Sequence, residues 1–244
     1  MATIICVDGL GGSPSVTFDR LTTHAESAGH RVVSVKTDGI VRHSDRVNRL
    51  ICTYLDLKPI LPEGTDIFFV GHSAGGSAVM NSLRHLKHLP RGVVLLSPAL
   101  PRGVKYLTPQ LLRVMVRNWR EFIFGREINL SGHEFSLLSG PLVNASPNIR
   151  PLPISGYEAR DLALRAPSFQ SLPSECEILH MWGEKDVWIS LKGQMTLNDK
   201  LVETSGRNRV TTVTFEKSGH ALLHSLERDD VIKRILKWIK HRSS

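Results

Sequence analysis

The chain has 244 residues, of which 41% are hydrophobic and 22% are charged, a composition typical of a globular protein with one substantial core. The formal net charge is +8, but the basic residues are spread along the chain without a nucleic-acid-binding motif, so we expect no dedicated nucleic-acid binding. No apolar run approaches the roughly 18 residues that a transmembrane helix needs. Composition therefore speaks against a nucleic-acid-binding protein and against an integral membrane protein.

The amino-terminal segment and the cysteines bear on the cellular compartment. Residues 3–7 follow Met1 almost directly and lack the basic region and long apolar stretch of a secretory signal, so they predict a first strand. The three cysteines, Cys6, Cys52 and Cys176, lie in apolar segments without the spacing of a metal site. We therefore expect buried, reduced thiols in a cytoplasmic protein.

Short apolar runs alternate with helical patterns along the first hundred residues. The pattern predicts strands at 3–7, 31–35, 66–70 and 92–96, and helices at 17–28, 43–57 and 76–86. Ser44 is expected to cap the second of these helices. Strands separated by helices indicate βαβ units in a mostly parallel sheet, and their continuous apolar character indicates a sheet covered on both faces.

The interval 99–173 breaks this rhythm. Thr108-Pro109 is typical of a helix start, apolar residues recur at helical spacing up to Gly125, and a short helix is expected near 157–164. We expect this interval to form an inserted lid at the carboxyl edge of the sheet, with residues 1–98 and 174–244 as the core. Its apolar stripe either packs on the body or roofs a substrate pocket.

Two more strands, at 177–182 and 210–215, and a final helix over 221–241 complete the pattern. The expected fold is therefore an α/β protein with about six strands in its sheet and helices on both faces. In such sheets functional groups gather at the carboxyl ends of the strands.

One strand ends in Gly71-His72-Ser73-Ala74-Gly75-Gly76, and a helical pattern follows. A serine flanked by glycines two residues away, between a strand and a helix, is typical of a nucleophile elbow, because only glycine tolerates the tight turn. A Gly-x-Ser-x-Gly pattern has only three fixed residues, so it also occurs by chance in ordinary chains. The pattern therefore needs support from a base, an acid and oxyanion donors elsewhere in the sequence.

The best-placed base is His220, which directly follows the last predicted strand, with His224 as its competitor one helical turn later. His72 neighbours the serine, but the elbow turns its side chain elsewhere, and a packing role is expected for it. Asp186 follows the preceding strand and is our candidate acid, while Glu184 begins the same loop. Asp186 could instead cap a helix or lie in a surface turn. The resulting order of serine, acid and histidine is the order found in α/β-hydrolases.

The oxyanion of an acyl-transfer reaction needs two preorganised donors. We expect them to be the Ala74 N–H and the Leu10 N–H, the latter from the glycine-rich loop after the first strand. That loop lacks the Gly-Lys-Ser/Thr of a phosphate-binding loop and the third glycine of a dinucleotide fingerprint. We therefore expect neither a cofactor nor a metal ion.

Through these segments, and through Gly183-Glu184-Lys185-Asp186 and Ser218-Gly219-His220, the chain resembles the α/β-hydrolase superfamily over nearly its whole length. The resemblance implies a Ser73 nucleophile, a His220 base, an Asp186 acid and a lid. Two departures are visible: Asp8-Gly9 stands where family members often have His-Gly, and the first antiparallel hairpin of the family has no counterpart.

The implied function is that of a serine hydrolase of the carboxylesterase, lipase or thioesterase kind, acting on a small acyl ester or thioester. Two alternatives stay open. The same fold could carry out acyl transfer or other cofactor-free chemistry, or it could bind a ligand without turning it over.

Overall fold

The computed structural model describes residues 1–37, 39–100, 108–130, 153–165 and 175–243. Six parallel strands form one sheet in the order β2-β1-β3-β4-β7-β8, which confirms the predicted fold class. Their bounds are β1 (Ala2–Val7), β2 (Arg31–Ser34), β3 (Asp66–His72), β4 (Gly92–Leu96), β7 (Glu177–Gly183) and β8 (Val210–Phe215). The chain begins at β1, next to the edge of the sheet, adds β2 at that edge and then returns past β1 to add β3 and the later strands on the other side. The strand order therefore reverses between β1 and β3, and a site is expected beyond the carboxyl ends of these two strands.

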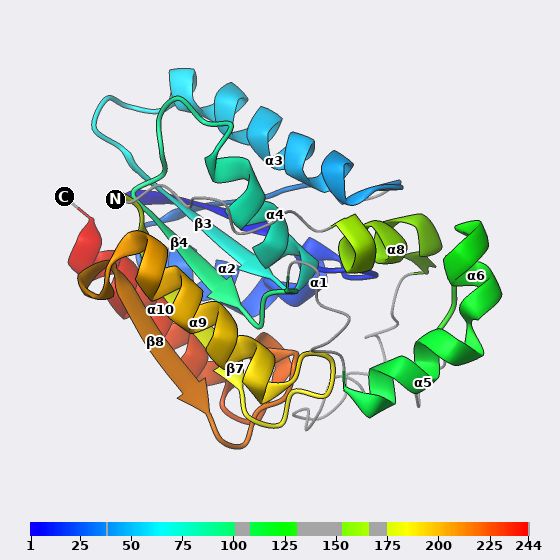
Figure 1. Cartoon of the computed structure of the whole chain (residues 1–244). Helices are drawn as coiled ribbons and strands as arrows, with labels where there is room; N and C mark the ends of the chain where they lie inside the picture. Colours follow the sequence, from blue (N-terminus) through cyan, green and yellow to red (C-terminus); the bar gives the residue numbers. More distant parts are fainter. Residues whose placement is uncertain (38, 101–107, 131–152, 166–174, 244) are drawn as a thin grey trace.

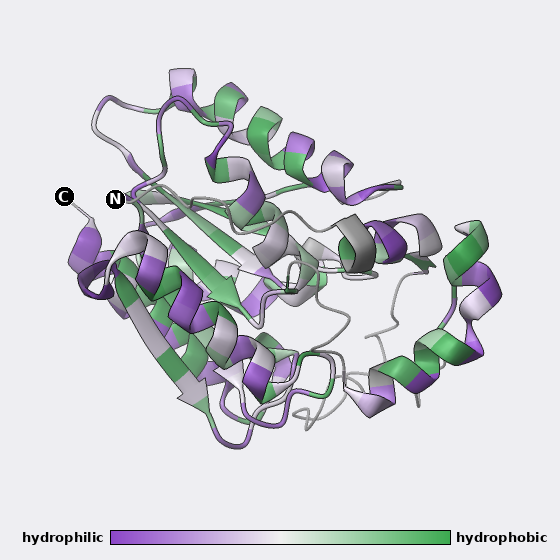
Figure 2. Cartoon of the chain, viewed as in Figure 1, coloured by the Kyte–Doolittle hydropathy of each residue, from purple (hydrophilic) through white to green (hydrophobic). Residues whose placement is uncertain are grey.

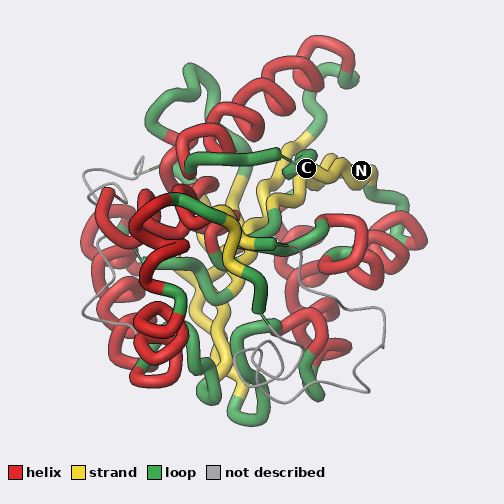
Figure 3. The backbone as a smooth tube through the Cα atoms, turned by 90° about the vertical axis from the view of Figure 1, so that its right-hand side faces the viewer, coloured by secondary structure: helices red, strands yellow, loops and turns green. Residues whose placement is uncertain are grey.

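Helices cover both faces of this sheet (Figures 1 and 3). One face carries α3 (His43–Leu57), α4 (Ala74–Leu83) and α9 (Leu191–Ser205), and the other carries α2 (Asp19–Ser27) and α10 (Arg228–Arg242). Ile5 and Val7 of β1 pack in the first layer, whereas Ile4 and Cys6 pack in the second. Successive side chains of a strand point to opposite faces, so a strand without polar interruptions, such as those coloured green in Figure 2, supplies both cores at once.

Between β4 and β7 the structure describes three helices and a small antiparallel pair of strands. These are α5 (Pro109–Arg117), α6 (Trp119–Phe124), β5 (Glu127–Ile128), β6 (Ile154–Ser155) and α8 (Gly156–Arg165). In Figure 1 they extend sideways from the carboxyl end of the sheet. The rest of the predicted insertion, at 101–107, 131–152 and 166–173, lies outside the described residues.

Several element boundaries differ from the expectation. The helix predicted over 17–28 is divided at Phe18 into α1 (Pro14–Thr17) and α2, and the one after Thr108 is divided at Asn118 into α5 and α6. Residues 221–227 hold a short 3₁₀ turn, η4 (Leu222–His224), before α10 begins. Two further short 3₁₀ turns are η1 (Lys58–Ile60) and η3 (Arg207–Arg209). The pattern located the helical segments but not the points at which they break.

Three further expectations were wrong or incomplete. Arg42, not Ser44, precedes α3, and the Arg42 N–H donates to the Asp45 carboxylate, 2.8 Å away, so the first turn is capped from within. The helix α9 was not predicted. Cys6 and Cys176 are buried, but Cys52 is exposed on α3.

In the described part of the chain, none of the helices combines the length and apolarity needed to cross a membrane.

Candidate active site

Ser73 lies at the turn between β3 and α4, at the carboxyl edge of the sheet. Its backbone has φ 54° and ψ −120°, a conformation that residues other than glycine rarely adopt. It is strained and persists only where the surrounding structure holds it. The turn is fixed by backbone hydrogen bonds from Ser73 N–H to Leu96 O and from Ala99 N–H to Ser73 O. The serine side chain remains partly exposed. A strained, partly accessible serine at the end of a central strand matches the predicted elbow.

The glycines around Ser73 are required by close backbone approach. A Cβ on Gly71 would lie 2.7 Å from atoms of Gly75 and Gly76, and a Cβ on Gly75 would lie 2.1 Å from the carbonyl oxygen of Val7. Both distances are far below van der Waals contact, so no side chain fits at either position without moving the backbone. This is the reason for the Gly-x-Ser-x-Gly pattern in this chain, and it brings β1 close to the start of α4.

The structure brings two of the predicted residues into direct contact. His220 Nδ1 lies 2.8 Å from Asp186 Oδ2, and the carboxylate and imidazole are both buried. The other oxygen, Asp186 Oδ1, accepts hydrogen bonds from the N–H groups of Trp188 and Ile189. Asp186 thus shapes its own loop, as the turn interpretation held, and also binds the imidazole. The indole of Trp188 stacks on the His220 ring at a centroid distance of 5.6 Å.

The loop after β1 lies against Ser73. A Cβ placed on Gly9 would be 2.7 Å from Ser73 Cβ and 3.2 Å from Ser73 Oγ. Leu10 follows Gly9 and packs against the small cluster formed by Ala74, Ala99 and Leu162. Within the described residues, neither the Leu10 nor the Ala74 N–H donates a hydrogen bond to the protein, and the Ala74 N–H is one of the free donors at the start of α4. The oxyanion-hole role of these two N–H groups stays a prediction.

Asp8 contacts the partly buried side chain of His72 and the buried side chain of Arg46. His72 Nδ1 lies 3.1 Å from Asp8 Oδ1. Arg46 of α3 donates through Nη1 to the backbone oxygen of Asp8, 2.6 Å away. The same guanidinium binds Glu158 of α8 in a bidentate contact, with Nε–Oε1 and Nη2–Oε2 distances of 2.8 and 3.1 Å. This network joins the loop after β1 to β3 on one side and to the inserted helices on the other.

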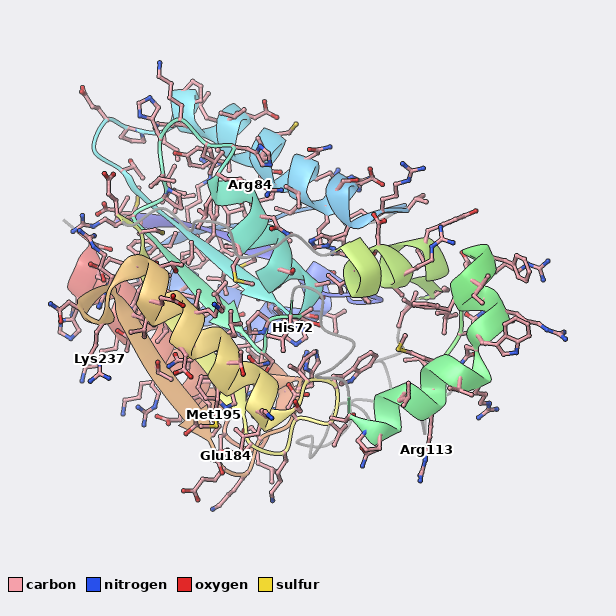
Figure 4. The ribbon with its side chains drawn as sticks, viewed as in Figure 1. His72, Arg84, Arg113, Glu184, Met195 and Lys237 are labelled. Carbon is pink, nitrogen blue, oxygen red and sulfur yellow. The ribbon has the colours of Figure 1, made fainter. Side chains whose placement is uncertain are left out.

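Sequence reasoning missed the roles of these residues. It gave His72 a packing role, whereas its ring bonds Asp8 and, through Nε2, the backbone oxygen of His220, 3.2 Å away. Figure 4 shows His72 near the carboxyl edge of the sheet. The available signal was the Asp8-Gly9 departure from the family pattern, because an acid in that loop needs buried donors.

The alternative site residues lie elsewhere. Glu184 is exposed, and among the described residues it does not bond His220. His224 lies on η4, and burial followed by the positive charge of His72 lowers its pKa. Among the described residues, no hydrogen bond joins Ser73 Oγ to His220, a contact that is often long in ligand-free enzymes. In the same part of the chain, no cluster of acidic, histidine and cysteine side chains could hold a metal ion.

A parallel α/β sheet with a strained serine after its third strand and an Asp–His pair at the same edge defines the α/β-hydrolase class. The chain belongs to the alpha/beta hydrolase family, whose model matches residues 8–234. No curated protein sequence matches it significantly.

Solved structures show the same fold at low sequence identity. A thermostable carboxyl esterase from Bacillus coagulans matches at a TM-score of 0.75 and 15% identity, covering 100% of this chain and 90% of that one. A thermophilic esterase from Thermogutta terrifontis matches at 0.69 and 17%, covering 100% and 91%. A monoacylglycerol lipase from Paleococcus ferrophilus matches at 0.64 and 19%, covering 99% and 95%.

Proposed function

We propose that the protein is a serine hydrolase that cleaves a carboxylic ester or thioester through an acyl-enzyme on Ser73. The observation that carries the proposal is the 2.8 Å hydrogen bond between His220 Nδ1 and Asp186 Oδ2 at the sheet edge that also holds Ser73. In the neutral ring this bond holds the proton on Nδ1 and leaves the lone pair on Nε2, which is the tautomer that a general base needs. The esterases and lipase named above are consistent with an ester substrate.

In the proposed reaction, His220 Nε2 removes the hydroxyl proton as Ser73 Oγ attacks the acyl carbon. The N–H groups of Leu10 and Ala74 bind the resulting oxyanion, and Asp186 stabilises the imidazolium. The tetrahedral intermediate then expels the alcohol or thiol, which takes its proton from His220. Water activated by the same imidazole releases the acid and restores Ser73. Residues 99–173 are proposed to form the lid over this site.

Covalent labelling tests the nucleophile. We expect a fluorophosphonate to modify the wild-type protein and short p-nitrophenyl esters to be hydrolysed, whereas Ser73→Ala should lose both reactions. Ser77→Ala is the matched control, because Ser77 lies one turn further along α4 and its buried Oγ bonds no described group. A wild-type protein that is neither labelled nor active toward esters would refute the hydrolase proposal.

Product analysis separates hydrolysis from acyl transfer. The wild-type protein is given a p-nitrophenyl or CoA ester in water with a competing alcohol or amine. Free acid as the main product supports hydrolysis, and acylated acceptor as the main product supports transfer. A series of acyl chain lengths in the same assay identifies the preferred substrate.

A further inference from the structure

The two ring nitrogens of His72 both face hydrogen-bond acceptors. Nδ1 faces the carboxylate of Asp8 at 3.1 Å, and Nε2 faces the backbone oxygen of His220 at 3.2 Å. A carboxylate and a carbonyl oxygen can only accept, and a neutral imidazole carries a single N–H. Both contacts are hydrogen bonds only if both nitrogens are protonated. An imidazolium cation at position 72 would therefore satisfy both contacts at once.

The carboxylate of Asp8 is buried and well supplied with donors. Besides His72, the Gly9 N–H donates to Oδ1 at 2.6 Å and the Thr17 hydroxyl donates to Oδ2 at 2.5 Å. Burial raises the pKa of Asp8, but the hydrogen bond and charge of His72, together with Thr17 and Gly9, outweigh burial and lower it. Asp8 is therefore an anion at neutral pH, opposite the cation of His72.

This pair contacts the segments on both sides of the proposed nucleophile. On one side, Asp8 binds the N–H of Gly9, which packs on Ser73 and precedes the Leu10 donor. On the other side, His72 binds the backbone of His220. We propose that Asp8 and His72 are positioning residues whose ion pair fixes the oxyanion loop and the His220 loop relative to Ser73. This inference rests on the proposed hydrolase function.

The other charged groups nearby leave this pairing intact. Arg46, from α3, donates through Nη1 to the backbone oxygen of Asp8 and through Nε and Nη2 to Glu158. His224, from η4, has a pKa that burial lowers most and the charge of His72 lowers next; the charge of Asp8 raises it, and Arg228 and Arg20 lower it further. Asp186 is bonded to His220. Among the described residues, Asp8 is the carboxylate that binds His72.

The rings of His72 and His220 have centroids 5.1 Å apart. A cation on His72 opposes the imidazolium that forms on His220 during the reaction, and the Asp8 carboxylate offsets that repulsion. Loss of Asp8 should therefore affect the transition state in two ways: the loops would move, and His72 would either repel His220 or lose a proton and its bond to the His220 backbone.

Nitrogen-15 NMR of the histidine side chains tests the charge state. Protein labelled at histidine nitrogen is measured at pH 7.5, and His72→Gln identifies the signals of His72. We expect both ring nitrogens of His72 to be protonated in the wild type and one of them to lose its proton in Asp8→Asn. A wild-type His72 with one unprotonated nitrogen would overturn the proposal.

Steady-state kinetics on p-nitrophenyl esters test the positioning role. Asp8→Asn should lower kcat by about 10- to 100-fold, the size of effect that a misplaced catalytic group produces, while KM changes less than about threefold. His72→Gln should give a similar loss, and the double variant should be no worse than either, because the two residues act as one unit. Asp19→Asn, an exposed acid at the start of α2, is the control and should match the wild type.

The outcomes separate this inference from the hydrolase proposal. Rates are expressed per site that a fluorophosphonate can label, so misfolded protein does not lower kcat. If the wild type is active and both single variants keep its kcat, the positioning role is wrong and the hydrolase function stands. If the wild type is inactive toward every ester, the function fails and takes the positioning role with it, whatever the NMR spectra show. If Asp8→Asn does not fold, Thr17→Val, which removes one donor to Asp8, should lower kcat by about two- to fivefold.

Discussion

Two carboxylate–imidazole pairs lie side by side at the carboxyl edge of the sheet, Asp186–His220 and Asp8–His72, and they differ at one nitrogen. Both use Nδ1 to bind an aspartate. In His72, Nε2 faces a carbonyl oxygen, whereas in His220 no described group binds Nε2. A base needs a free lone pair, so we propose that His220, and not His72, removes the proton. The partner of the second nitrogen, rather than the residue type, separates a candidate base from a positioning residue.

The largest expected effect comes from breaking the His220 pair. Asp186→Asn should lower kcat by about 10³- to 10⁴-fold, because an amide favours the wrong imidazole tautomer and cannot stabilise the imidazolium. Glu184→Gln, two residues earlier on the exposed side of the same loop, should keep wild-type kinetics. Ester hydrolysis by purified variants checks both. An active Asp186→Asn together with an inactive Glu184→Gln would reverse the assignment of the acid.

The sequence alone predicted the first pair and missed the second, for a physical reason. Asp186 and His220 follow neighbouring parallel strands, β7 and β8, so the strand pattern places them at one edge of the sheet. The elbow after β3 follows from the same logic, whereas the two oxyanion donors, Leu10 and Ala74, stay predictions. His72 directly precedes the nucleophile, and nothing in the local pattern reveals that its ring turns toward a buried acid 64 residues earlier.

Other buried polar residues were also not predicted from the sequence pattern. Arg46 and Glu158 lie on helices, where charged residues usually indicate a solvent-exposed face. The two side chains are nevertheless buried and paired, although they are 112 residues apart in the sequence. The helix α9 was missed because its buried face includes Gln194 alongside Leu197 and Leu201, while Leu191 and Met195 are exposed. Ser190, whose hydroxyl accepts the Gly193 N–H, is the cap signal that could have found it.

The buried Arg46–Glu158 pair should give the next largest effect, on stability. Arg46→Met leaves Glu158 buried and uncompensated and removes the donor to the Asp8 backbone, so the free energy of unfolding should fall by about 3–5 kcal/mol. Arg46→Met with Glu158→Met should recover much of that loss. The exposed Arg234–Asp230 pair, with a 2.8 Å separation, is the control, and Arg234→Met should cost less than about 1 kcal/mol. Urea unfolding measures the stability of all three variants. Equal losses in Arg46→Met and Arg234→Met would contradict the expected difference between the buried and the exposed pair.

The buried histidine His43 should make stability sensitive to mild acid. Burial, followed by the charge of Arg46, lowers its pKa from the ordinary 6.5 to about 4. Between pH 6.5 and about pH 4, His43 is therefore protonated in the unfolded chain and neutral in the folded protein. His43 thus contributes stability above pH 6.5 that is lost as the pH falls toward 4, by about 3 kcal/mol in total.

Urea unfolding at pH 7.5 and pH 4.5 checks this linkage. His43→Gln keeps an acceptor for the Asn81 side chain, which lies 3.3 Å from His43 Nε2, and should lose less stability between the two pH values than the wild type. His241→Gln, exposed near the end of α10, should follow the wild-type curve. A wild-type loss that is unchanged in His43→Gln would assign the acid sensitivity to other groups.

The smallest effect should come from the hydroxyl that completes the Asp8 pair. Thr17→Val keeps the shape of the side chain and removes its donor to Asp8 Oδ2, so the free energy of unfolding should fall by about 2 kcal/mol, the usual cost of a lost hydrogen bond to a charged group. Thr17→Ser restores the donor and should recover most of that stability. Thr23→Val, on the exposed face of α2, where the hydroxyl donates to the Asp19 backbone oxygen, should be close to neutral. The Thr17 hydroxyl also helps to keep the pKa of Asp8 low, so its loss should raise that pKa. As acid is added, the stability contributed by the Asp8 carboxylate should therefore be lost at a higher pH in Thr17→Val than in the wild type. A Thr17→Val protein with wild-type stability and wild-type acid response would mean that His72 and Gly9 alone suffice to keep the Asp8 carboxylate ionised.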